Sequence, residues 1–396
     1  MNQNNRIITL IGIGLMVSLL GDTTLYIVLP TQYAQAGILE TQVGLMLAAN
    51  RAIRIFLNSP YGFLIERLPR RKMLIPSLIV GGMASLLYAV PGFWTLLIGR
   101  LIWGLAWAGI YLGCTTVVLD ISDDTNRGRL IGRLQMWMFI GMGVSSIFGG
   151  VIFDLIGYAP TFMLSAMLIF GGAAVWLFLL PETRPDDAPI PQHEQAPQTK
   201  LRLSMPLILT IISNGLVWLI FMGFFAAVLP LLLQNRLGDE IGILGLFVIP
   251  LVSFTGLLSA LNTVVSLFSS PISGWLSDRT GNRWQLVAYM MVLGIIALSL
   301  CAVAGSAVVI GATMLIAIVS GVLITQLMAL VGDYAPPKQR GRILGIMNTI
   351  GDAGAAAGPF IGFLLIKPLG LVGVFTLGTL LIAVWLPFTL WMMIRY

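Results

Sequence analysis

The chain has 396 residues, a formal net charge of +6 and a mean hydropathy of +0.95. Hydrophobic residues make up 58% of it and charged residues 10%, whereas an ordinary soluble domain carries about 25% charged residues. This composition excludes a soluble globular protein, because no soluble fold could bury so much apolar surface. Apolar runs of about 20 residues recur along the chain, each long enough to cross a membrane as a helix. The runs are continuous and not alternating, so they predict helices and not a barrel.

The residue types that carry most enzyme chemistry are scarce. Cys114 and Cys301 fall inside predicted spans, where they are expected to pack as small apolar residues, and His193 lies in a polar loop. The sequence holds no disulfide or metal framework, no nucleophile constellation and no Gly-Lys-Ser/Thr phosphate loop. We therefore expect no enzyme activity, no cofactor and no direct use of ATP. No cleavage site follows the first apolar run, which predicts a retained span and not a signal peptide.

In chain order, the apolar runs predict an all-α membrane protein with twelve transmembrane helices. Their expected ranges are 7–30, 42–65, 73–92, 94–118, 130–156, 160–180, 206–233, 246–276, 284–303, 306–330, 343–366 and 371–394. Between the sixth and seventh helices, the stretch PETRPDDAPIPQHEQAPQTKLR is rich in Pro, Gln and charge, and it predicts a linker. The predicted organisation is a six-helix bundle over 1–180, a cytoplasmic linker over 181–205 and a second six-helix bundle over 206–396.

Lysine and arginine are distributed unevenly between the predicted loops. Nearly all of them fall on the side that also holds both termini, whereas the opposite side holds only Arg236 and Lys367. Cytoplasmic loops carry the excess of positive charge in membrane proteins, so both termini are expected to be cytoplasmic. The net charge is thus a topology signal and predicts no nucleic-acid partner.

The two halves of the sequence repeat each other. The segment 127–132 matches 340–345 at an offset of 213 residues, and Asp120 matches Asp333 at the same offset. The segment 28–30 matches 228–230 at an offset of only 200, so about 12 extra residues entered the second half, and part of 241–252 is expected to be interfacial or re-entrant. Two halves in the same orientation follow the parallel-repeat plan of many secondary transporters.

A second repeated element is the loop after the second helix of each half, matched at an offset of 212. Its residues are Gly62, Glu66, Arg67 and Arg71 in the first half, and Gly274, Asp278, Arg279 and Arg283 in the second. These loops resemble the signature of the major facilitator superfamily, with Glu66 in place of the usual Asp and Pro69 in place of the usual Gly. The resemblance covers essentially the whole chain and implies that the loops gate the cytoplasmic side; topology control is the simpler alternative.

Further motifs resemble the drug:proton antiporter branch of that superfamily. Arg100 with Gly104 is similar to its arginine motif in the fourth helix. Glycines similar to its glycine motif occur in the fifth helix at 141, 149 and 150, where Ser145–Ser146 replaces Gly-Pro, and in the eleventh at 354, 358 and 362. Close helix packing is the simplest role for these glycines.

Five ionisable residues fall inside predicted spans, where charge is costly and usually functional. They are Asp22, Arg51, Arg54, Arg100 and Asp352. In the second helix, Arg51, Arg54 and Asn58 share one face. At about 1.5 Å of rise per residue, Asp22, Arg51 and Arg100 lie at one depth, roughly 20–24 Å from the cytoplasmic boundary.

Four of these charges, those of Asp22, Arg51, Arg54 and Arg100, have no counterpart in the second half. The counterpart of Asp22 is Met222, and those of Arg51 and Arg54 are Thr263 and Ser266, whereas Asn50 is matched by Asn262. The fold therefore does not need the charges twice. Asp22 could form a structural ion pair with Arg100 or Arg51, or the cluster could bind substrate or couple protons.

The sequence thus predicts a secondary transporter working by alternating access, a monomer in the bacterial inner membrane, whose partners are a small-molecule substrate, membrane lipid and protons. The leading hypothesis is export of small hydrophobic or amphipathic molecules driven by the proton gradient, with Asp22, Arg100 and Asp352 as proton-coupling candidates. The alternative is transport of an anionic solute or amphiphile clamped by Arg51 and Arg54, with Asn50, Asn58 and Asn262 in the substrate cavity. A receptor or scaffold without transport is a third class, with no large soluble domain to support it.

Overall fold

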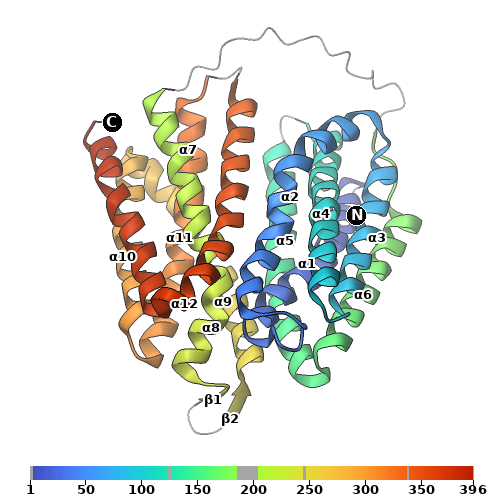
Figure 1. Cartoon of the computed structure of the whole chain (residues 1–396). Helices are drawn as coiled ribbons and strands as arrows, with labels where there is room; N and C mark the ends of the chain where they lie inside the picture. The colour runs from blue at the N-terminus through green and yellow to red at the C-terminus, as the bar shows by residue number, and fades with distance from the viewer. Residues whose placement is uncertain (1–2, 124–125, 185–203, 244–246, 337–338, 396) are drawn as a thin grey trace. The chain divides into compact units, whose positions relative to one another are not determined.

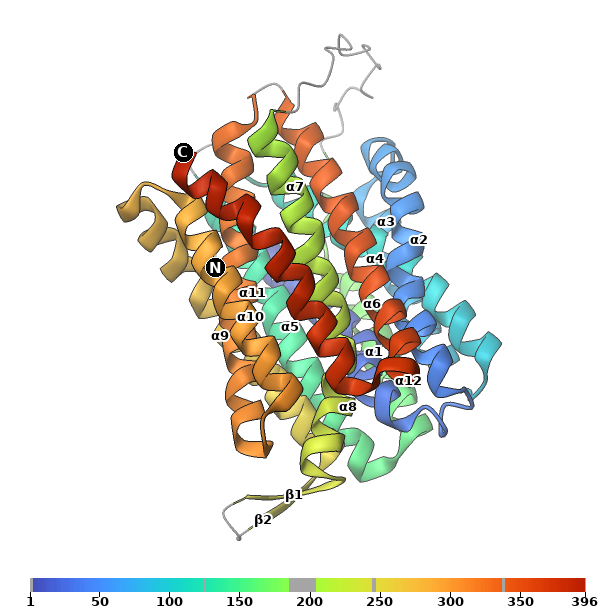
Figure 2. The same ribbon diagram turned by 60° about the vertical axis from the view of Figure 1, so that its left-hand side comes forward.

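A computed structural model of the chain describes residues 3–123, 126–184, 204–243, 247–336 and 339–395 (Figure 1). It has the twelve-helix, two-bundle fold that the sequence predicts. Besides α2 (Glu40–Arg67) and α3 (Arg70–Tyr88), the described residues form nine helices that are long and apolar enough to cross a membrane. One of them, α12 (Arg340–Arg395), holds two spans, because Gly370 has a φ of 65° and bends the helix there (Figure 2). Glycine adopts this left-handed backbone without a steric penalty.

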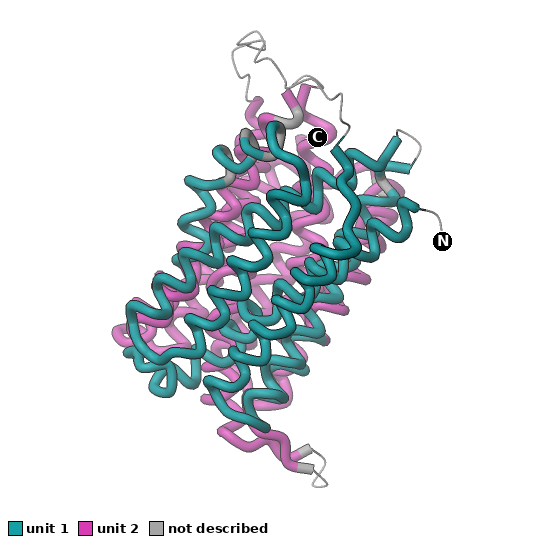
Figure 3. Tube along the Cα trace, turned by 90° about the vertical axis from the view of Figure 1, so that its right-hand side faces the viewer, with its two compact units in different colours: residues 1–40, 49–198, 252–260 teal, residues 41–48, 199–251, 261–396 magenta. Residues whose placement is uncertain are grey.

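The chain divides into two compact units, each described here by itself (Figure 3). Unit 1 comprises Met1–Glu40, Ala49–Gln198 and Val252–Ala260, and unit 2 comprises Thr41–Ala48, Thr199–Leu251 and Leu261–Tyr396. The helices of the first half are α1 (Gln3–Gln32), α2 (Glu40–Arg67), α3 (Arg70–Tyr88), α4 (Phe93–Asp120), α5 (Arg127–Ile156) and α6 (Tyr158–Leu179).

Glycines on α5 bring it close to α1, the helix that carries Asp22. A β-carbon on Gly149 would lie 2.6 Å from the Thr24 hydroxyl, and one on Gly141 would lie 2.9 Å from the α-carbon of Met16. Small residues at helix contacts allow backbones to approach closely inside membranes. The glycine pattern of the fifth helix therefore serves to hold α1 in place.

The first transmembrane helix of the second half has an irregular centre. It consists of α7 (Met205–Val217), the π-helical segment η1 (Trp218–Phe225) and α8 (Ala226–Leu237). Gly358 of α12 packs against this segment, where a β-carbon would overlap the Leu219 carbonyl and the Phe224 amide. π-Helical turns are uncommon and often occur at functional positions. The remaining helices are α9 (Leu251–Thr280), α10 (Arg283–Val303) and α11 (Ser306–Tyr334).

The predicted start of the eighth helix at residue 246 is wrong. The structure has an antiparallel hairpin there, β1 (Glu240–Ile243) and β2 (Phe247–Pro250), in which Ile241 pairs with Ile249 (Figure 1). Helix α9 begins only at Leu251, directly after Pro250. The two strands contain several β-branched residues, which favour strands. Pro250 suits the start of a helix. A short apolar run does not by itself distinguish a strand from a helix.

Candidate functional site

Asp22 of α1 and Arg100 of α4 form a buried ion pair in unit 1. The Arg100 Nη1 donates a hydrogen bond to the Asp22 Oδ1. The Arg100 side chain is 0% exposed and that of Asp22 is 16% exposed. An isolated guanidinium in this apolar setting would be very unfavourable, so each charge depends on the other.

Asn50 of α2 completes the surroundings of this pair. Its Nδ2 donates to the same Asp22 Oδ1, over 3.3 Å, and the residue is only 4% exposed. Its own oxygen, Oδ1, is buried and has no hydrogen-bond partner among the described residues. The close approach of α2 to α4 places it here, since a β-carbon on Gly104 would lie 2.5 Å from the Asn50 carbonyl oxygen. Gly104 of the arginine motif therefore lets α2 reach the pair.

Two tyrosines surround the guanidinium groups. The Tyr26 ring lies near two of them, with its centroid 5.4 Å from the Arg100 Cζ and 5.9 Å from the Arg51 Cζ. Arg51 Nε also donates to the Tyr26 hydroxyl over 3.3 Å. On α3, the buried Tyr88 ring lies 5.9 Å from the Arg100 Cζ, and its hydroxyl donates to the Gly99 carbonyl. Aromatic faces attract cations, so the rings help to hold these charges inside the membrane.

These tyrosines are not among the site residues that the sequence predicts. Tyr26 follows Asp22 by four residues, so both lie on one face of α1, and this spacing was an available signal. Tyr88 comes from the end of another helix and left no such signal. The structure thus links Arg51 to the Asp22–Arg100 pair through one aromatic ring.

The other predicted site residues lie elsewhere or outside the described side chains. Arg54 is half-buried on α2, one turn beyond Asn50, and the side chain of Asn58 lies outside the described part. Asp352 belongs to unit 2, where the neighbouring Gly351 faces the Trp218 ring. Asn262 is also in unit 2, and its Oδ1 is a second buried oxygen without a partner among the described residues.

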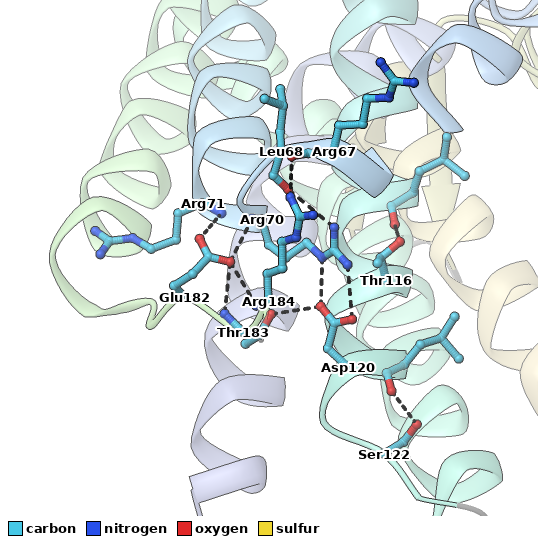
Figure 4. Close-up of polar contacts among 12 residues, drawn as sticks. Arg67, Leu68, Arg70, Arg71, Thr116, Asp120, Ser122, Glu182, Thr183 and Arg184 are labelled. Carbon is cyan, nitrogen blue, oxygen red and sulfur yellow. Dashed lines mark hydrogen bonds and ion pairs between the residues drawn. The ribbon is translucent and has the colours of Figure 1, made fainter. Parts of the chain in front are cut away.

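A polar network lies at the end of unit 1 where α2 ends and α3 begins (Figure 4). Arg70 donates to both carboxylate oxygens of Asp120, from Nε over 2.8 Å and from Nη2 over 3.3 Å. Glu182, just after α6, accepts the backbone N–H groups of Arg70 over 2.8 Å and Arg71 over 3.1 Å, at the start of α3. It also accepts those of Thr183 and Arg184. The network joins the ends of α2, α4 and α6 to the start of α3.

Unit 2 has a simpler network at the corresponding turn. Arg283 binds Asp278 over 3.0 Å and Asp333 over 2.8 Å. Arg279 lies over the Trp275 ring, 4.5 Å from its centroid. The ion pairs line a cavity of about 300 Å³. Of the residues predicted to gate this unit, Asp278 and Arg283 form an ion pair with each other.

The structure changes the register of the repeated loop. Arg70 and Arg283 are the first residues of α3 and α10, an offset of 213, and each binds an aspartate at the end of the following helix, Asp120 or Asp333. The repeat at an offset of 212 pairs Arg71 with Arg283, but the Arg71 side chain donates to the Leu177 carbonyl. The side chains around Gly62 and Glu66 lie outside the described part.

A twelve-helix bundle pair with charges buried in one half defines a polytopic membrane transporter. The chain belongs to the Major Facilitator Superfamily, whose sequence model matches residues 11–256 and 251–396. It is a secondary transporter, and the family does not consist of enzymes.

Known proteins of this family resemble the chain at low identity. The multidrug resistance protein MdtG of Salmonella choleraesuis is 29% identical over 322 residues, which cover 80% of this chain and 77% of that protein. A bacterial homologue of the human lysosomal transporter Spinster, in an inward-facing and occupied conformation, matches with a TM-score of 0.82 at 13% identity, covering 98% and 96% of the two chains. The human organic anion transporter MFSD10 matches with a TM-score of 0.68 at 17% identity, covering 98% and 100%. Both solved structures share the fold of this chain.

Proposed function

We propose that this protein exports small hydrophobic or amphipathic molecules across the bacterial inner membrane in exchange for protons. The observation that carries the proposal is the buried Asp22–Arg100 ion pair, a titratable group held inside the membrane by a fixed positive charge. The likeness to MdtG, a multidrug resistance protein, supports export as the direction of transport. The gradient supplies the energy, and no cofactor is part of the proposal.

In this proposal, Asp22 carries the proton. Both Arg100 and Asn50 donate to its Oδ1, so the groups that sense its charge meet at this oxygen. Protonation removes the negative charge and weakens the attraction to Arg100, because one partner of the pair becomes neutral. The free energy of exposing Asp22 and Arg100 to each side of the membrane then differs between the protonated and ionised states of Asp22. This difference biases alternating access.

The first prediction concerns Asp22→Asn. The amide keeps the size and hydrogen-bonding capacity of the side chain but cannot bind or release the proton. We expect pH-gradient-driven transport of rhodamine 6G, an amphipathic dye, to fall to the level of empty liposomes, while equilibrium binding of the dye persists. The same assays on Asp352→Asn show whether the second acid shares the role. Normal gradient-driven transport by Asp22→Asn would contradict the proposal.

A second function, transport of an anionic substrate, is favoured by the charge balance of the cluster. Asp22 provides one negative charge, whereas Arg51, Arg54 and Arg100 provide three positive ones. Two guanidiniums on consecutive turns of α2 suit a carboxylate or phosphate, which accepts paired hydrogen bonds from arginine. The fold shared with an organic anion transporter is compatible with this function.

A further inference from the structure

We propose that the side-chain amide of Asn50 acts as a switch that follows the protonation of Asp22. In the ionised state its Nδ2–H donates to the carboxylate. When Asp22 gains a proton, the amide turns by half a rotation about its Cβ–Cγ bond, and its Oδ1 accepts the new O–H. The inference rests on the proposed proton-carrying role of Asp22, and Asn50 is a positioning residue for that step.

The hydrogen bond from the Asn50 Nδ2 to the Asp22 carboxylate is the arrangement present in the structure. Asn50 is 4% exposed, and its Nδ2 lies 3.3 Å from the Asp22 Oδ1. Its Oδ1 is buried without a partner among the described residues. A buried acceptor that forms no hydrogen bond is unfavourable and calls for an explanation. A hydrogen bond from the protonated Asp22 carboxyl to the Asn50 Oδ1 provides that explanation.

The repeat shows why the switch belongs to unit 1. Asn262, the counterpart of Asn50, also has a buried Oδ1 without a partner among the described residues. The fold therefore leaves this oxygen open in both halves. Position 222, however, is a methionine where the first half has Asp22. A titratable carboxyl group beside the open amide is specific to the first half.

The other groups around Asp22 are poor acceptors for its proton. The charged or titratable side chains among them are Arg100 on α4, Tyr88 on α3, Tyr26 on α1, Arg51 and Arg54 on α2, and Tyr158 on α6. The charged residues of α5 lie towards the two ends of that helix; they are Arg127, Arg129, Arg133 and Asp154. Arginine only donates hydrogen bonds. The hydroxyls of Tyr26 and Tyr88 already accept from Arg51 and Arg100. Of Arg100 and Asn50, the two side chains that donate to Asp22, Asn50 is the one that also offers an open acceptor.

The test is Asn50→Leu, which keeps the approximate volume and removes both hydrogen-bonding functions. The purified full-length protein is titrated by infrared difference spectroscopy, with the Asp22 carboxyl band assigned by its loss in Asp22→Asn. The variant loses the stronger bond, the one to the ionised carboxylate, so the protonated state gains. We expect the titration midpoint to move to higher pH by about one unit.

A matched control separates this effect from a general loss of stability. Asn214 is 3% exposed in unit 2, and its amide donates to the Met347 carbonyl over 3.0 Å. Asn214→Leu should lower the unfolding temperature without moving the Asp22 midpoint. If Asn50→Leu fails to fold, Asn50→Ser is used instead, because it replaces the amide by a smaller polar group. This variant is expected to shift the Asp22 midpoint in the same direction.

The outcomes distinguish this inference from the proposed function. An unmoved midpoint in a folded Asn50 variant overturns the inference, even where Asp22→Asn abolishes coupled transport. A moved midpoint together with a pH-dependent shift of the Asn50 amide carbonyl band, absent in Asn50→Leu, supports it. Normal coupled transport by Asp22→Asn overturns the proposed function, and the inference fails with it.

Discussion

At the scale of single residues, Tyr26 connects the two functions considered for the cluster. The centroid of its ring lies 5.9 Å from the Arg51 Cζ and 5.4 Å from the Arg100 Cζ, so a substrate that moves Arg51 disturbs the surroundings of the Asp22 pair. Cation–π attraction is worth more where water is excluded than at an exposed surface. This arrangement gives a physical route from a substrate-binding guanidinium to the proton-carrying group.

Arg51→Ala tests the anionic alternative. If Arg51 binds an anion through paired, charge-assisted hydrogen bonds, its loss should weaken binding of fluorescein at least about tenfold, or ~1.4 kcal/mol. Arg51→Lys is the matched control, because it keeps the charge without the planar fork, and an intermediate affinity is expected. Fluorescence polarisation with fluorescein and rhodamine 6G measures both variants. Equal affinity of wild type and Arg51→Ala for fluorescein would argue against an anion clamp.

The sequence predicted which charges are buried but not how they pair. Depth along the helices placed Asp22, Arg51 and Arg100 in one layer and left either arginine open as the partner. The choice of Arg100 depends on the close approach of helices around Gly104, which no spacing in one helix reveals. Tyr26 escaped notice for a related reason, since an aromatic residue in an apolar span is usually a packing residue.

At the scale of helices, the start of α3 and the end of α6 are joined by Glu182. Partial burial alone would raise the pKa of this carboxyl, but the backbone N–H donors of residues 184, 70, 71 and 183 outweigh burial and hold its pKa below the ordinary value. Negative charge is also favourable at the N-terminus of α3. The ionised Glu182 therefore stabilises this corner of unit 1.

Glu182→Gln tests that contribution. At neutral pH we expect a loss of less than about 1 kcal/mol, because a neutral amide accepts these hydrogen bonds less strongly and solvent screens the charge of this exposed side chain. Since the pKa is depressed in the folded state, the stabilisation is present above the unfolded-state pKa and is lost as the pH falls through the folded-state value. The unfolding temperatures of wild type and variant should thus differ at pH 7 and converge in acid. Glu40→Gln, in the first turn of α2, is the control variant. If the unfolding temperatures of wild type and Glu182→Gln differ by the same amount at all pH values, the role assigned to ionised Glu182 is contradicted.

The repeated turns show a limit of motif comparison. The motif matched at an offset of 212 from Gly62, but α10 starts one residue later relative to its motif than α3 does. The extra residue allows Gly281 to end α9 with a φ of 71°, a conformation that glycine adopts readily. Helix starts, and not motif letters, therefore identify Arg70 as the counterpart of Arg283.

At the scale of the whole molecule, the class of fold followed from composition because the thickness of a membrane sets the length of its helices. The hairpin β1–β2 did not follow, because an apolar run near a membrane boundary satisfies both helix and strand patterns. The π-helical centre of the seventh span also left no signal, since its residues are uniformly apolar.

The predicted topology places the hairpin outside the cell, opposite the two termini. Val248 is 64% exposed, so Val248→Cys should react with a membrane-impermeant maleimide on intact cells. Ser204→Cys, at the exposed start of α7, should react only after the membrane is permeabilised. Gel-shift detection of the label distinguishes the two, and the reverse pattern would overturn the assigned orientation.

The two native thiols offer an experimental opportunity. Cys114 and Cys301 are both free and fully buried, each 0% exposed. The wild-type sequence therefore serves as its own background for thiol-directed probes, with no need to remove native cysteines and disturb the packing around them. Spin labels on one introduced cysteine in each unit can then report, by pulsed magnetic resonance, how the distance between the units changes as protons and substrate bind.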